Sequence, residues 1–330
     1  MVDLAEVGAR ARALALQIVW DQWDALGYLA PEPARRPRNS VVDPEALLLL
    51  SILVREADDR LRAVMRWWIE ARPDLWSMQR LRRLLVSFPR WHSAGRAGSM
   101  EPALSGREAR WYPIIAGALA GEPLVGEPVR QKKREIQLLN PAALVLRSRL
   151  LLGVNPRSDI LVYLLGRGVD AASVREIAGT TVYAHTTVHQ ILQQLAASRL
   201  VLRKGKRPHR YSICTEAWQE VFGRDAIKSG LNARIGFRRL YGKKTAARMW
   251  LCWAQVFSLL AFLTTVDADG ADNPEDNPYV HAVFQHCLRE RRTFIEHRLY
   301  VPTYHGLDPR RFQLLHDCID AVAEWYAAQA

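Results

Sequence analysis

Apolar residues recur at helical spacing near the middle of the chain. Between residues 185 and 197 they stand at positions i, i+3, i+4 and i+7, which predicts a helix with one buried face. That buried face consists of Val188, Ile191, Leu192 and Leu195. The opposite face is polar and offers donors and acceptors suited to base edges. Its residues are His185, Thr186, Thr187, His189, Gln190, Gln193 and Gln194.

The segments on either side of this helix are also patterned. Ser173, with Glu176 three residues later, has the spacing of a capping box, so a short helix is expected to follow Ser173. Downstream, two β-rich runs around a Gly/Pro turn predict a hairpin that ends near residue 213. The cations of the hairpin are Arg203, Lys204, Lys206, Arg207 and Arg210. Upstream, Pro156 after Asn155 marks the start of another helix.

Most of the remaining chain has a helical pattern. Residues 1–29 predict one helix that ends near Gly27. Asp43 is expected to cap a helix that has Pro44 in its first turn and breaks near residues 57–59. Pro141 after Asn140 marks a further helix start, and helices are expected over 278–299 and 308–327.

A shorter helix is expected after Ser77. Its apolar face consists of Leu81, Leu84 and Leu85, which leaves its arginines more exposed. These arginines are Arg80, Arg82 and Arg83. A solvated helix face is the favoured interpretation, and contact with phosphate is the alternative.

These patterns predict a mainly α fold with a central winged helix-turn-helix, one small β-hairpin and flanking helical domains. The expected boundaries are an N-terminal helical domain over 1–125 and a connecting helix over 126–155. The winged helix-turn-helix then spans 156–213, and a C-terminal helical domain for dimerisation or effector binding spans 214–330.

Positive charge is concentrated in one part of the chain. The net charge is +12, and residues 177–266 carry fourteen Lys or Arg against three acids. Residues 177–215 contain no Asp or Glu. A face that contacts protein normally mixes charges of both signs, whereas a face that contacts phosphate does not. The charge pattern therefore favours a nucleic-acid partner.

Residues 156–213 resemble the DNA-binding module of bacterial winged-helix regulators of the multiple-antibiotic-resistance and isocitrate-lyase-regulator types. The matching positions are Thr186, Thr187, Val188, His189, Ile191, Leu192, Leu195, Leu200 and Val201. Arg199 departs from the pattern, because those families usually have Gly before the Leu-Val pair. The resemblance implies a DNA-binding regulator, and it does not extend to the flanking regions.

Several other classes of function lack a signature in the sequence. No phosphate loop, dinucleotide-binding glycine motif, serine-hydrolase motif or zinc-protease motif is present, so neither an enzyme nor a cofactor is expected. The C-terminal His and Cys residues lack diagnostic ligand spacing, so no metal site is expected. The four cysteines are read as reduced thiols, and the acidic N-terminus is not a signal peptide, which together predict a cytoplasmic protein.

The segment Met249 to Val266 has no charged residue. Its eighteen residues meet the minimum length of a membrane span. Its polar residues and the amphipathic helices after it favour a buried core or dimer helix instead.

The expected function is sequence-specific binding of double-stranded DNA by a transcriptional regulator, as a homodimer. In this hypothesis the helix from His185 enters the major groove, and the hairpin lies along neighbouring phosphates or the minor groove. Two alternatives remain. One is a DNA-binding initiator or accessory protein of a plasmid, phage or defence system, and the other is a winged-helix scaffold for protein interaction.

Overall fold

The computed structural model confirms several of the predicted helix caps. A side-chain oxygen of Asp43 accepts a hydrogen bond from the N–H of Ala46 at 3.1 Å. Ser77 caps the helix that begins at Met78 in the same way, and Ser173 forms a complete capping box with Glu176. These short-range hydrogen bonds satisfy N–H groups that have no partner within the helix.

The structure describes residues 3–28, 40–54, 57–58, 60–61, 63–65, 68, 72–88, 136–138, 140–167, 170–214, 216–218, 250–266, 278–302 and 311–329. Its α-helices are α1 (Leu4–Ala25), α2 (Pro44–Val54), α4 (Met78–Ser87), α6 (Leu144–Leu152), α7 (Pro156–Arg167), α8 (Val174–Thr181), α9 (His185–Ala197), α12 (Trp253–Thr264), α13 (Pro278–Glu296) and α14 (Arg311–Gln329). Short 3-10 helices are η2 (Pro73–Leu75) and η3 (Pro141–Ala143), and the strands are β1 (Ala172–Ser173), β2 (Val201–Lys204) and β3 (Arg210–Ile213).

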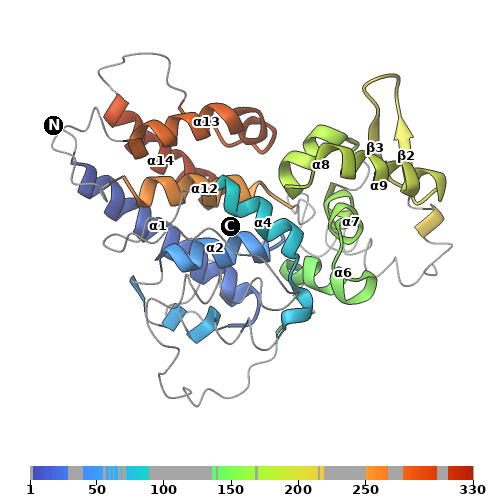
Figure 1. Ribbon diagram of the computed structural model, residues 1–330, viewed down its shortest axis with the longest axis horizontal. Coiled ribbons are helices and arrows are strands. Elements are labelled where there is room, and N and C mark those ends of the chain that lie inside the picture. Colours follow the sequence, from blue (N-terminus) through green and yellow to red (C-terminus); the bar gives the residue numbers. More distant parts are fainter. Residues whose placement is uncertain are drawn as a thin grey trace.

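Helix α12 is the centre of a helical body, which we define as α1, α2, α4, α12, α13 and α14 (Figure 1). Its residues Trp253 and Phe257 are fully buried, and their rings lie 5.4 Å apart. Residues 250–264 are nearly all buried, so the prediction of a core helix for this segment is confirmed over its described part. None of the helices in the described ranges is long and apolar enough to cross a membrane.

The body combines the two ends of the chain. One hydrophobic cluster contains side chains from α1, α2 and α4 together with side chains from α12, α13 and α14. The N-terminal and C-terminal helices, which the sequence assigned to separate domains, therefore pack against each other. The proposed domain boundaries themselves stay a prediction.

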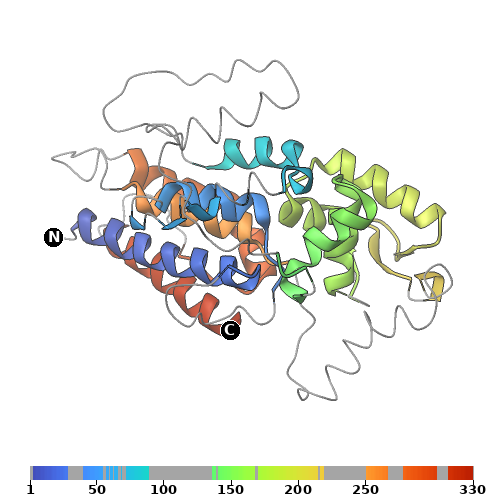
Figure 2. The same ribbon diagram turned by 90° about the horizontal axis from the view of Figure 1, so that it is seen from below.

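A second hydrophobic cluster belongs to a smaller unit, which we call the module and define as α7, β1, α8, α9, β2 and β3. Figures 1 and 2 show the module beside the body. Its three strands form an antiparallel sheet in the order β1-β3-β2, with Ala172 opposite Tyr211 and Arg203 opposite Tyr211 on the other side. The sequence predicted the hairpin β2–β3. It did not predict β1, which is two residues long.

Candidate nucleic-acid interface

Helix α9 buries the apolar face that its periodicity predicts. Val188, Leu192 and Leu195 are buried in the core of the module, and Ile191 is partly buried against it. His185, Thr186, Gln190, Gln193 and Gln194 are exposed, and Thr187 and His189 are half-buried. The predicted polar residues therefore lie together on the outer side of one helix.

The polar side chains of α9 differ in whether they already have partners. Arg157 of α7 donates a hydrogen bond to the side-chain oxygen of Gln194 at 2.7 Å. Gln193 lies 3.5 Å from the Nε2 atom of His189. Gln190 has no hydrogen-bond partner within the described ranges. Its amide group is thus available for a ligand that approaches this face.

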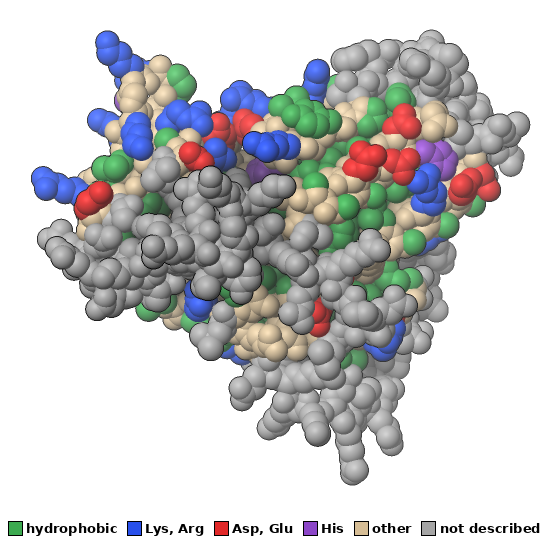
Figure 3. Space-filling model, turned by 180° about the vertical axis from the view of Figure 1, so that it is seen from behind, with side chains coloured by type: hydrophobic (Ala, Val, Ile, Leu, Met, Phe, Trp, Pro, Cys, Tyr) green, Lys and Arg blue, Asp and Glu red, His purple; other side chains and the backbone are tan. Residues whose placement is uncertain are grey.

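The hairpin carries cations that are exposed to solvent. Arg203, Lys204, Lys206 and Arg207 are exposed and make no ion pair or hydrogen bond through their side chains to the rest of the described chain. Gly205 provides the left-handed backbone at the turn, with φ +77°. Figure 3, which views the molecule from behind, shows Lys and Arg side chains gathered on this projection at the upper left.

Arg210 differs from the other predicted hairpin cations. Its Nη2 atom lies 3.1 Å from a carboxylate oxygen of Glu176, and it also donates to the carbonyl oxygen of Ala171 at 2.7 Å. Both partners belong to the β1–α8 region, so Arg210 joins the hairpin to the start of α8. Its charge is already balanced by Glu176, and it contributes less to the field of the hairpin than the four unpaired cations.

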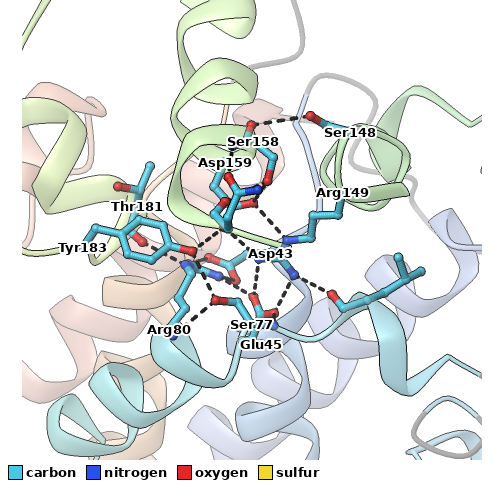
Figure 4. Close-up of polar contacts among 12 residues, drawn as sticks. Asp43, Glu45, Ser77, Arg80, Ser148, Arg149, Ser158, Asp159, Thr181 and Tyr183 are labelled. Carbon is cyan, nitrogen blue, oxygen red and sulfur yellow. Dashed lines mark hydrogen bonds and ion pairs between the residues drawn. The ribbon is translucent and has the colours of Figure 1, made fainter. Parts of the chain in front are cut away.

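A buried cluster of charges, which the sequence pattern missed, lies between the body and the module (Figure 4). We call it the charge cluster, and its members are Asp43, Glu45, Arg80, Arg149 and Asp159. Their side chains are 0–1% exposed. The cluster joins α2 and α4 of the body to α6 and to α7 of the module.

Each guanidinium in the charge cluster binds two carboxylates. Arg149 binds Glu45 at 2.5 Å and Asp159 at 2.8 Å. Arg80 binds Glu45 at 2.8 Å and also binds Asp43 through both terminal nitrogens. Burial alone would raise the pKa of Glu45, but Arg149 and Arg80 hold that pKa below its ordinary value. Burial acts to lower the pKa of Arg149, but the carboxylates of Asp159 and Glu45 raise it above its ordinary value.

The prediction that Arg80 is more exposed is therefore wrong. Its side chain is fully buried, whereas Arg82 and Arg83 are exposed. Arg80 stands four residues before the buried Leu84 and faces inward with it. A buried guanidinium is tolerated only where carboxylates and carbonyl groups surround it, and here Asp43, Glu45 and a backbone carbonyl do so.

The charge cluster reaches the turn that precedes α9. Tyr183 lies in this turn, is buried, and donates its hydroxyl hydrogen to Asp159 at 2.7 Å. The same hydroxyl lies 3.2 Å from the hydroxyl of Ser77, the residue that caps α4. Burial, reinforced by the charge of Asp159, raises the pKa of Tyr183, so it stays a neutral donor.

Body helices also hold α8, the helix before this turn. Gln255 of α12 donates to the carbonyl oxygen of Gly179 at 2.7 Å. The hydroxyl of Thr180 lies 3.0 Å from Nε2 of His297, just beyond the end of α13. Burial lowers the pKa of His297 to about 4, so its imidazole is neutral at pH 7. The start of α9 is thus oriented by the body through side chains on several helices.

The described residues contain no group of three or more His, Cys, Asp or Glu side chains that could hold a metal ion. Cys252, Cys287 and Cys318 are buried free thiols. Thr215 and residues 219–249, within the region expected to form the C-terminal helical domain, lie outside the described part of the chain.

The sequence matches no protein-family model, no curated protein and no solved structure. The resemblance of residues 156–213 to winged-helix regulators therefore remains a prediction that rests on the residues themselves.

Proposed function

We propose that this protein binds double-stranded DNA through α9 and the β2–β3 hairpin, as a sequence-specific transcriptional regulator. The observation that carries the proposal is the pairing of two surfaces. One is a helix face of polar side chains that includes an unpartnered Gln190, and the other is a hairpin with four exposed, unpaired cations. The segment from Ile177 to Thr215, which includes both, contains no carboxylate.

The order of elements supports the assignment to the winged helix-turn-helix class. Helix α7 is followed by β1, α8, α9, β2 and β3, and the sheet order is β1-β3-β2. In that class the second helix of the helix-turn-helix enters the major groove, which corresponds here to α9. The hairpin corresponds to the wing.

The two surfaces are suited to different contacts. Amide and hydroxyl groups on α9 suit base edges, and glutamine suits adenine in a bidentate contact. The cations of the hairpin suit phosphates, which fix the position of the protein without reading the sequence. We further propose a homodimer, because one α9 offers few base-reading side chains and two copies double the number of base pairs that are read.

Selection from a random duplex library tests the proposal. The purified full chain is expected to enrich a short motif and to bind it with an affinity that falls steeply as salt concentration rises. Enrichment of a two-fold symmetric motif supports the homodimer. Failure to retain any duplex at low salt would contradict the proposal and favour the alternative of a protein-interaction scaffold.

A further inference from the structure

Helix α4 of the body contacts both the end of α8 and the turn that precedes α9. Arg80 of α4 donates to the carbonyl oxygen of Thr181, the last residue of α8, at 2.8 Å. Ser77, the cap of α4, lies 3.2 Å from the hydroxyl of Tyr183, two residues before α9 begins. Figures 1 and 2 both show α4 on the side of the body that meets the module.

The outer face of α4 is basic. Arg82 and Arg83 are exposed, and the side chain of neither has an ion-pair or hydrogen-bond partner within the described residues. No acid occurs between Met78 and Ser87, so neither charge is balanced within the helix. These two guanidiniums are therefore available to an anionic partner.

The position of Arg83 on the helix relates it to the module. Arg83 lies about one turn beyond Arg80 along α4, but on the outer face, since Arg80 is fully buried and contacts α8 whereas Arg83 is exposed. The rise of an α-helix places Arg83 about 9 Å along the axis from Ser77. Phosphates of one DNA strand are spaced about 3.4 Å along the duplex axis, so a length of this size is comparable to the span of two or three phosphates.

We propose that Arg82 and Arg83 of α4 extend the duplex-binding surface from the module onto the body, where they contact backbone phosphates beside the site of α9. This inference rests on the proposed function and adds a second strip of phosphate contacts to those of the hairpin. The hydrogen bonds from α4 to Thr181 and Tyr183 fix the strip relative to the bases that α9 reads.

The salt dependence of duplex binding tests this surface. Arg82→Ala with Arg83→Ala is expected to reduce the slope of log affinity against log salt by roughly 1.8, at about 0.9 for each phosphate. Arg82→Lys with Arg83→Lys keeps both charges and should keep most of the slope. Arg10→Ala is the control, because Arg10 pairs with Asp320 on the body and should leave the slope unchanged.

The outcomes separate this inference from the function on which it rests. If the wild-type protein binds duplex and the alanine pair on α4 has the wild-type slope, the α4 surface is wrong and the module can still bind DNA. If the wild-type protein binds no duplex, both proposals fail. Both α4 positions are exposed and alanine favours helix, so the variants should retain the wild-type helix content by circular dichroism.

Discussion

Arg80 of α4 donates a hydrogen bond from Nε to the carbonyl oxygen of Thr181, 2.8 Å away, and so joins the body to the last residue of α8. The same guanidinium binds Asp43 and Glu45 at the start of α2. One side chain thus connects two body helices to the module. The orientation of α9 follows from this attachment, because α8 and α9 are separated by a turn of only three residues.

Removing the hydroxyl of Tyr183 should weaken the attachment. Tyr183→Phe deletes the hydrogen bond to the buried Asp159 and leaves that carboxylate with fewer donors. The expected loss is about 1–3 kcal/mol in the free energy of unfolding, measured by urea denaturation. Tyr211→Phe is the matched control, because Tyr211 is equally buried but its hydroxyl has no hydrogen-bond partner in the described ranges. Equal effects of the two substitutions would contradict a role for the Tyr183 hydroxyl.

Removing one guanidinium from the charge cluster should destabilise the protein strongly. Arg149→Met leaves Glu45 and Asp159 buried with one less cation, and loss of a buried partner costs about 3–5 kcal/mol. Thermal or urea unfolding at pH 7 measures this loss. Arg60→Met, which breaks a partly exposed ion pair with Asp58, should have a much smaller effect. If Arg149→Met lowered the free energy of unfolding as little as Arg60→Met does, the prediction would be wrong, and the methionine would replace the buried guanidinium by apolar packing.

Two buried histidines should make the protein less stable at mildly acidic pH. Burial lowers the pKa of His286 and of His297 to about 4 each, and the neighbouring Arg289 and Arg167 act in the same direction. A histidine with a lower pKa in the folded state binds its proton more readily when the chain is unfolded. Stability is therefore complete above pH 6.5 and falls as the pH decreases toward 4, by up to about 3 kcal/mol for each histidine.

Urea midpoints between pH 7.5 and pH 4.5 measure this dependence. Replacing His286 by Asn removes one of the two titrating groups, so the variant should show a shallower decline than the wild-type protein. A wild-type midpoint that stays constant from pH 7 to pH 5 would mean that the histidines are not buried in neutral form.

Gln190 should contribute to the choice of DNA sequence. Gln190→Ala is expected to lose about 1–3 kcal/mol of binding free energy at the preferred site, and little on unrelated duplex. Titration of both duplexes by fluorescence anisotropy gives the two values. Gln313→Ala on α14 is the control, because Gln313 is exposed on the body. An equal loss of binding free energy on both duplexes would contradict base recognition by Gln190. It would indicate that Gln190 contacts phosphate or that the substitution disturbs the fold.

Local features of the fold were predictable from the sequence. The periodicity of Val188, Leu192 and Leu195 predicted the buried face of α9, since neighbouring turns of one helix determine it. The caps Ser77 and Ser173 were predictable for the same reason, because a cap bonds to the turn that follows it. The polar face of α9 and the exposed hairpin cations followed directly from these elements.

Features that depend on distant partners were not predictable. Arg149 is buried because Glu45 lies against it, 104 positions away in the sequence. A pattern of apolar and polar positions treats any arginine as exposed, and the partner that permits its burial is not visible locally. Strand β1 was missed since its two residues are defined by pairing with β3. For the charge cluster, the only hint within a single helix was the position of Arg80, which lies on the same inward side of its helix as Leu84.

The most direct measurement of the central claim is the salt dependence of duplex binding by a hairpin variant. Lys204→Ala, Lys206→Ala and Arg207→Ala together remove exposed cations that have no partner in the described chain. If each contacts one phosphate, the slope of log affinity against log salt should fall by roughly 2.7, on every duplex sequence. A folded variant that binds duplex with the slope of the wild-type protein would show that the hairpin does not lie on DNA.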